Sequence, residues 1–127
     1  YAVAEEYKNR LRIKVPSLNQ MTLNLSGGNQ QKVVVAKTMA ADLDIIFFDE
    51  PTKGIDVGAK QEIYHLMNEM AAEGKAIIMI SSDMEEILGM SDRIVVLSEG
   101  RIAGELKKEN FSQENVLTLA SGMEVTL

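Results

Sequence analysis

Two short apolar runs separated by a segment of helical period constrain the fold of this chain more than any other feature. Residues 45–48 (IIFF) and 76–80 (AIIMI) have the length and apolar character of strands buried in a sheet. Between them, apolar residues recur at the spacing of one helix face: Ile63, Leu66, Met67, Met70 and Ala71. Asp56 is placed to cap this helix and Gly74 to end it. The order strand, helix, strand predicts a right-handed crossover between parallel strands.

Two further helices are predicted ahead of the first strand. Within residues 1–11, three apolar residues spaced four apart favour a short helix that ends before the segment around Pro16. Ser26 is a hydroxyl residue suited to helix capping, and it precedes two glycines and a run rich in alanine, lysine and glutamine. We therefore expect a second, buried helix from Ser26 onward.

A helix, a hairpin and a last helix are predicted after the second strand. Residues 82–85 (SDME) have the spacing of a capping box, which predicts that Ser82 starts a helix. Residues 93–106 (RIVVLSEGRIAGEL) indicate two strands around a Glu-Gly turn. Residues 112–123 favour a short helix capped by Ser112. The predicted fold class is therefore α/β, with parallel strands, crossover helices and a C-terminal β-hairpin.

Composition excludes several classes of protein. Of the 127 residues, 46% are hydrophobic and 25% are charged, which is typical of a chain that folds around a core. The net charge of -6 argues against a general electrostatic attraction to nucleic acid or anionic lipid. The longest apolar runs are far shorter than the roughly 20 residues that span a bilayer. The absence of cysteine fits a reducing compartment.

Residues 25–32 (LSGGNQQK) have the character of an anion site. Backbone N–H groups and the positive end of the dipole meet at the start of a helix, and glycines allow a phosphate to approach closely. A plain capped helix with a glycine entry is the alternative. The usual phosphate-binding loop is missing from the sequence, because the single Gly-Lys pair, Gly74 and Lys75, is preceded five positions earlier by Glu69.

Two carboxylates, Asp49 and Glu50, follow the first apolar run directly. Ligands of open α/β sheets bind at the carboxyl ends of parallel strands, where this pair is expected to lie. The first acid can hold a magnesium ion, and the second can orient or deprotonate an attacking water. The alternative is that the acids only end a hydrophobic run at the surface.

The sequence assigns less to the other polar residues. Asp56 is expected to cap a helix, to reach a second nucleotide site, or to do both. His65, the only histidine, lies off the apolar helix face and is expected at the surface without a function. The eight methionines are best explained as core-filling residues.

Three segments together resemble the nucleotide-binding domain of ABC transporters. They are residues 25–32 (LSGGNQQK), 45–52 (IIFFDEPT) and 54–60 (GIDVGAK), and the spacing between them also agrees with that family. Residues 28–32, 49–60 and 80–106 are most similar to the second half of the tandem ATPase subunits that serve bacterial importers of ribose, galactose, xylose and similar sugars. The resemblance covers residues 13 to about 122.

The resemblance implies that the first segment contacts ATP held by another domain. Ser26, Gly27 and Gly28 correspond to the signature loop that touches the γ-phosphate of an ATP bound to the opposite domain. Gln30 of the same motif is also expected at the nucleotide. The phosphate that this helix would contact therefore belongs to a partner.

The resemblance also assigns roles around the acidic strand. Asp49 corresponds to the magnesium-binding acid, Glu50 to the general base, and Asp56 to the aspartate that communicates between two nucleotide sites. Ser82 stands where the family usually has its switch histidine, which implies a weak or degenerate local site. The implied cofactors are ATP and Mg²⁺.

The resemblance implies a three-layer P-loop NTPase fold of which this chain is one part. Residues 1–127 correspond to the C-terminal part of a single ABC ATPase domain that lacks the Walker A loop and the Q-loop. We expect the full-length protein to be an ATPase and this chain alone to be inactive. The resemblance also implies that the sheet lacks the strand bearing the phosphate loop, which would expose strand edges and apolar faces and makes self-association of the chain a further hypothesis.

The implied partners are a second ATPase domain, a membrane permease dimer and, indirectly, a periplasmic sugar-binding protein, with no nucleic acid. The implied location is cytoplasmic, peripheral on the inner face of the bacterial cell membrane. Two alternatives stay open: the head of an ABC-class ATPase of DNA repair or chromosome structure, and a non-catalytic interaction module. The sequence does not identify the sugar, because its choice is expected to reside in the other subunits.

Overall fold

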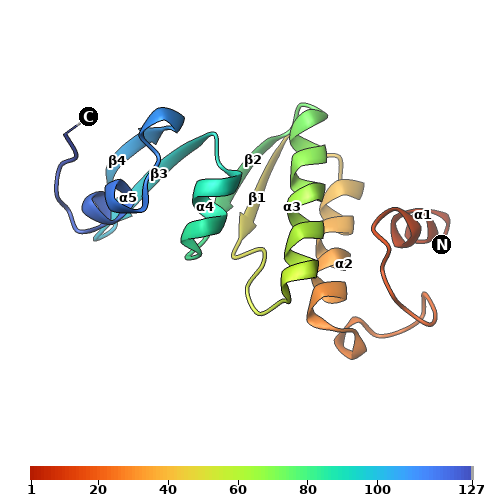
Figure 1. Ribbon diagram of the computed structural model, residues 1–127. Coiled ribbons are helices and arrows are strands. Elements are labelled where there is room, and N and C mark those ends of the chain that lie inside the picture. The colour runs from red at the N-terminus through yellow and green to blue at the C-terminus, as the bar shows by residue number, and fades with distance from the viewer. Residues whose placement is uncertain (127) are drawn as a thin grey trace. The chain divides into compact units, whose positions relative to one another are not determined.

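The computed structural model describes residues 1–126, which divide into two compact units. The first unit is Tyr1–Ile80, and the second begins at Ser81. Figure 1 shows their helices and strands in chain order. None of the helices in the described part of the chain has both the length and the apolar character needed to cross a membrane.

The first unit contains the predicted strand, helix and strand. Its elements are α1 (Ala2–Arg10), a 3-10 turn (Thr22–Asn24), α2 (Gly27–Ala40), β1 (Ile45–Asp49), α3 (Val57–Ala72) and β2 (Ala76–Ile80). β1 and β2 pair in parallel, in a register that runs from Ile45 opposite Ala76 to Asp49 opposite Ile80. The predicted parallel pair and both early helices are therefore confirmed.

Helices α2 and α3 lie side by side in this unit and build its core (Figure 1). The side chains of Val35 on α2 and of Ile63 and Met70 on α3 are almost completely buried. Ile46 and Phe48 of β1 are buried as well. The predicted face of α3 is confirmed at four of its positions, but Ala71 is exposed, because it lies about 80° around the helix from Ile63, at the margin of the apolar stripe.

The opposite face of the strand pair is apolar and exposed. Ile45 and Phe47 of β1 are 58% and 66% exposed, and Ile78 and Ile80 of β2 are 43% and 52% exposed. Because side chains alternate along a strand and the register pairs these positions, all four lie on one face. The strand pair is therefore buried on one face only, and the exposed apolar face expected of a truncated sheet is present.

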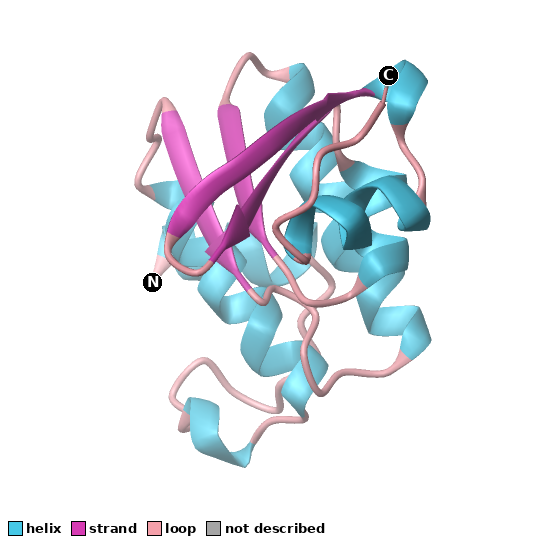
Figure 2. Ribbon diagram, turned by 90° about the vertical axis from the view of Figure 1, so that its left-hand side faces the viewer, coloured by secondary structure: helices cyan, strands magenta, loops and turns pink. Residues whose placement is uncertain are grey.

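The second unit consists of a hairpin between helices. Its elements are α4 (Met84–Met90), β3 (Arg93–Ser98), β4 (Arg101–Lys107), a 3-10 turn (Lys108–Asn110) and α5 (Gln113–Ala120). β3 and β4 are antiparallel (Figure 2). They are joined by Glu99 and Gly100, whose φ angles of 49° and 74° are those of the two-residue turns that suit hairpin twist. The predicted hairpin and final helix are confirmed.

Leu106 is the most buried side chain of the second core. It packs in one cluster with other apolar residues of the hairpin and α5: Ile94, Val96, Val116 and Leu119. Helix α5 begins as predicted, since the Ser112 hydroxyl accepts a hydrogen bond from the Asn115 N–H at 3.0 Å. This unit therefore has an apolar core of its own.

The predicted cap of α4 is wrong by one residue. Asp83, not Ser82, precedes the helix, and its carboxylate accepts hydrogen bonds from the N–H groups of Glu85 and Glu86 at 3.1 and 3.3 Å. Ser81 supports this turn, because its hydroxyl accepts from the Asp83 N–H and contacts the Glu86 carboxylate. An ionised carboxylate is the stronger acceptor at the positive end of a helix, so Asp83 outcompetes its neighbour.

Candidate functional site

The start of α2 is built by Ser26 as predicted. Ser26 has an extended backbone, and its hydroxyl accepts hydrogen bonds from the backbone and side-chain nitrogens of Asn29 at 3.4 and 2.9 Å. Asn29 in turn accepts the N–H of Lys14 at 2.9 Å through its side-chain oxygen, which ties the preceding segment to the helix. The first-turn amides at Gly27 and Gly28 lie at the positive end of α2, where helices bind anions.

The two glycines of this turn pack against the loop that leads into α3. A Cβ added to Gly28 would lie 2.8 Å from the Cβ of Ala59, which is closer than side chains tolerate. A Cβ added to Gly27 would meet the Gly54 carbonyl oxygen and the Ile55 side chain at 3.6 Å, an ordinary contact. The structure therefore brings the Ser26–Gly28 turn directly against the segment that contains Asp56.

Asp56 caps α3. Its carboxylate accepts the Ala59 N–H at 2.9 Å, and its backbone is extended. The helix ends as predicted near Gly74, whose φ of 92° favours glycine. The capping role of Asp56 is confirmed, whereas its communication role stays a prediction.

Gln30 holds the loop that precedes α2. Its side-chain amide nitrogen donates to the carbonyl oxygens of Leu25 and Leu23 at 2.8 and 3.4 Å. This arrangement fixes the backbone just before Ser26. A contact between Gln30 and a nucleotide stays a prediction.

Asp49 and Glu50 lie where β1 ends. Asp49 is exposed, on the same face of the strand as Phe47, and Glu50 is half-buried. The Glu50 N–H donates to the Ile80 carbonyl oxygen at 2.8 Å and extends the pairing with β2 by one residue. Glu50 has a φ of 48°, in the left-handed region that few non-glycine residues adopt. The carboxylates therefore start on a defined backbone at the carboxyl end of the parallel pair.

The buried residues after Glu50 fix the course of the loop toward Asp56. Pro51 and Thr52 are buried, and the Lys53 N–H donates to the Glu50 carbonyl oxygen at 3.2 Å. The acid pair and Asp56 therefore lie at the two ends of one short, hydrogen-bonded loop.

The acid pair is compatible with magnesium. Among residues 1–126, no three acidic or histidine side chains gather into a complete metal site. Mg²⁺ is usually held by one or two carboxylates together with phosphate oxygens and water. Asp49, exposed beside Glu50 at the strand end, provides that kind of partial ligand set.

Ser82 belongs to the second unit, where it is exposed and stands one residue before the cap of α4. His65 is also exposed, with its imidazole 3.8 Å from the Glu69 carboxylate of the same helix. The surface position predicted for His65 is confirmed.

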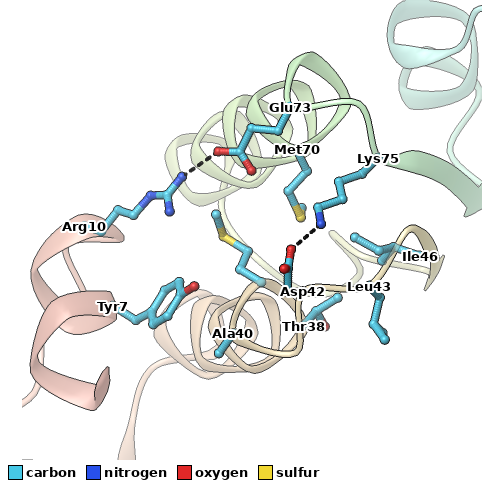
Figure 3. A pocket seen from close by; sticks show the side chains of 11 residues that line it. Tyr7, Arg10, Thr38, Ala40, Asp42, Leu43, Ile46, Met70, Glu73 and Lys75 are labelled. Carbon is cyan, nitrogen blue, oxygen red and sulfur yellow. Dashed lines mark hydrogen bonds and ion pairs between the residues drawn. The ribbon is translucent and has the colours of Figure 1, made fainter. Parts of the chain in front are cut away.

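A cavity of about 190 Å³ lies in the first unit, away from the acid pair. Figure 3 shows two ion pairs among its lining residues: Arg10 with Glu73 at 3.1 Å, and Lys75 with Asp42. The hydrogen bond from Lys75 lowers the pKa of Asp42, and the same hydrogen bond raises the pKa of Lys75. Asp42 and Lys75 precede β1 and β2, so the cavity lies at the amino ends of the strands, opposite the end where ligands of such sheets bind.

The burial of Lys32 was not predicted from the sequence. Its burial depends on Glu62, which lies in another helix and which no local spacing connects to it. A lysine near the start of a helix is usually read as a solvated residue. Only the packing of α2 on α3 identifies it.

Comparison with known proteins gives consistent results. A model of the ABC transporter family matches residues 2–53. The chain is 56% identical over 119 residues to the ribose import ATP-binding protein RbsA of Clostridium perfringens, covering 94% of this chain and 24% of that protein. It is 55% identical over 124 residues to a Burkholderia ambifaria protein provisionally named for ribose, galactose and methyl galactoside import, covering 98% and 24%. The chain thus spans about a quarter of the length of these relatives.

A solved structure agrees with the fold. The dimeric, post-hydrolysis structure of the ATP-binding cassette MJ0796 bound to ADP and Pi is similar with a TM-score of 0.75 and 27% identity. The similarity covers 87% of this chain and 47% of the cassette. In sequence and in fold, the chain therefore matches the ATPase domain of ABC transporters.

Proposed function

We propose that this chain is the C-terminal part of one ATPase domain in an importer subunit that couples ATP binding and hydrolysis to sugar uptake. One observation carries the proposal: the helix start at Ser26–Gly28 is packed against the loop that joins the acid pair to Asp56. An anion-binding helix end and an acidic strand end are the two parts that phosphate chemistry requires. The names of the ribose and galactose import relatives support sugar uptake.

The first-turn amides of α2 would contact the γ-phosphate of an ATP held by a second ATPase domain. The Ser26 hydroxyl oxygen accepts from Asn29, and its O–H can still donate, so the proposed contribution of this turn combines that hydroxyl with the backbone N–H groups and the helix dipole. The dimeric form of MJ0796 supports a second domain as the partner.

Asp49 would hold Mg²⁺ and Glu50 would act as the general base. When bound, the ion would neutralise charge on the β- and γ-phosphate oxygens. Glu50 would accept a proton from the attacking water and orient it toward the phosphorus. The hydrogen bond from the Glu50 N–H to the Ile80 carbonyl oxygen fixes the backbone from which this carboxylate extends.

Ser82 would take the place of a histidine in the local nucleotide site. A hydroxyl cannot carry the positive charge of an imidazolium, so the γ-phosphate would be bound less strongly. We therefore propose that the site to which Glu50 belongs is slow or degenerate, and that the α2 turn serves the faster partner site.

The proposed partners are a permease dimer and, through it, a periplasmic sugar-binding protein. The ATPase would lie in the cytoplasm, peripheral on the inner face of the bacterial cell membrane. The identity of the sugar would be set by the permease and the binding protein.

The test compares phosphate release at the two nucleotide sites of the full-length protein. Glu50→Gln should lower hydrolysis at its own site by about 10²- to 10⁴-fold, the usual contribution of a general base. Ser26→Arg should impair the partner's site more than its own, because the bulky cation would obstruct a turn that serves the partner's ATP.

Two results would contradict the proposal. Equal loss at both sites in Ser26→Arg would exclude a contact in trans. Hydrolysis unaffected by Glu50→Gln at either site would favour the non-catalytic interaction module. Calorimetry adds a third check, since the 127-residue chain alone should not bind Mg-ATP, whereas a version extended by the phosphate-binding loop should.

A further inference from the structure

Lys32 is a buried cation on the second turn of α2. The residue is 6% exposed, which is unusual for lysine. Burying an ammonium group is unfavourable unless opposite charge and hydrogen-bond acceptors replace the lost water. A lysine in this position therefore needs partners supplied by the fold.

Two segments supply those partners. The Glu62 carboxylate of α3 forms an ion pair with the Lys32 ammonium group. The Arg12 carbonyl oxygen, from the segment between α1 and α2, lies 3.5 Å from the same nitrogen. Lys32 thus connects three segments of the first unit, and Glu62 keeps about half of its side chain in solvent.

The ion pair lies about one helical turn beyond the contact of Gly28 with Ala59. Lys32 follows Gly28 by four residues, and Glu62 follows Ala59 by three, so each helix presents both members of its pair on one face. The contact of Gly28 with Ala59 sets the distance between α2 and α3 at the first turn. At the second turn, the ion pair restrains the rotation of α2 about its axis and its sliding along α3.

We propose that Lys32, through Glu62, positions the N-terminal turn of α2 against the Asp56 loop, and that ATP hydrolysis by the assembled protein depends on this ion pair. The inference rests on the proposed function. Lys32 is a positioning residue here, because its ammonium group is occupied by protein partners rather than aimed at a nucleotide. Its loss would let α2 turn or slide, and a misplacement of about 1 Å in a catalytic arrangement can lower a rate by about 100-fold.

The test measures kcat and KM for ATP in the full-length protein. Lys32→Met removes the charge but keeps the apolar stem, and it should lower kcat at least about tenfold while KM changes less than about twofold. Lys32→Arg should recover kcat to within about threefold, because the guanidinium retains the charge. The matched control is Lys37→Met, the same change at an exposed site on the same helix, and it should leave kcat unchanged.

Glu62→Gln provides a second route to the same ion pair without changing the buried residue. Its side chain is half in solvent, so the variant should fold, which a thermal midpoint close to that of Lys37→Met would verify. Glu62→Gln should lower kcat as Lys32→Met does, and the double variant should be no slower than Lys32→Met alone.

Three results would overturn the inference. They are a kcat of Lys32→Met equal to that of the Lys37→Met control, an unchanged kcat in Glu62→Gln, and independent, additive losses in the double variant. Glu50→Gln, with phosphate release measured separately at the two nucleotide sites, separates this inference from the proposed function. If Glu50→Gln lowers release at its own site while Lys32→Met does not lower kcat, only the positioning role fails; if Glu50→Gln leaves release at its own site unchanged, the proposed function itself fails.

Discussion

The close approach of α2 to α3 makes Gly28→Ala a demanding test of the structure. The new methyl group would lie 2.8 Å from the Ala59 Cβ, whereas carbon atoms pack at about 3.5–4.0 Å. Because Ala59 lies in the first turn of α3 and its Cβ cannot rotate away, the helices must separate by about 1 Å. Overpacking of this kind costs about 1–3 kcal/mol, and alanine returns at most about 1 kcal/mol of helix propensity.

The free energy of unfolding should therefore fall by about 1–2 kcal/mol in Gly28→Ala. Gly27→Ala is the matched control for unfolding, since its methyl group would meet its neighbours at an ordinary 3.6 Å. Chemical denaturation of the full-length protein would measure both. ATP hydrolysis should also fall by up to about 100-fold in Gly28→Ala, because the shift moves the α2 turn away from the Asp56 loop.

Adding Ala59→Gly to Gly28→Ala removes the overlapping methyl group. The double variant should regain most of the hydrolysis even though glycine in α3 leaves it up to about 1 kcal/mol less stable than the parent. The observed packing of these helices would be refuted if Gly28→Ala had the same free energy of unfolding and the same rate of ATP hydrolysis as the unmodified protein.

Three further outcomes are expected. Lys75→Met should raise the pKa of Asp42 toward its ordinary value, and NMR titration of the Asp42 carboxyl carbon would detect this; an unchanged pKa would exclude the hydrogen bond. The stabilisation that this pair provides should be lost as the pH falls through the lowered pKa of Asp42 and, at the other extreme, as it rises through the raised pKa of Lys75. Leu106→Ala should lower the free energy of unfolding by about 2–5 kcal/mol, because it leaves a cavity in the core of the second unit, and denaturation would measure the loss. Asp83→Ala should destabilise α4 by about 1 kcal/mol whereas Ser82→Ala should not, so hydrogen exchange of the α4 amides that responds equally to both would contradict the observed cap.

Local signals predicted the elements of this fold well. Ser26, Asp56 and Ser112 cap the helices that they were expected to cap, and the Glu99-Gly100 pair forms the predicted turn. Each of these features depends on residues within a few positions, so the sequence contains the whole interaction. The prediction that Ser82 starts α4 failed because its neighbour Asp83 is also a good cap, and the hydrogen bonds that Asp83 accepts identify it as the cap.

Features that depend on distant residues were not predictable. The apolar strand pattern indicates burial but not on how many faces, and the exposed apolar face with Phe47 and Ile80 was expected only from the family resemblance. The positions of Asp49 and Glu50 followed from the strand end, a local signal. Two further features depend on how α2 packs against α3: the contact of Gly28 with Ala59 and the burial of Lys32. Local sequence patterns do not show which helices will pack together, so neither feature was predicted.

At Glu50, the residue that would be best for stability differs from the residue that the proposed function requires. A non-glycine residue in the left-handed region is disfavoured by about 1–2 kcal/mol, and Glu50 adopts it with a φ of 48°. Glycine would relax this conformation and would be the better residue for folding alone. Selection for thermal stability without selection for hydrolysis should therefore enrich Glu50→Gly, and the resulting variants would be more stable but would lack the carboxylate proposed as the general base. If the proposed role of Glu50 holds, the chain keeps a carboxylate here at a cost in backbone free energy.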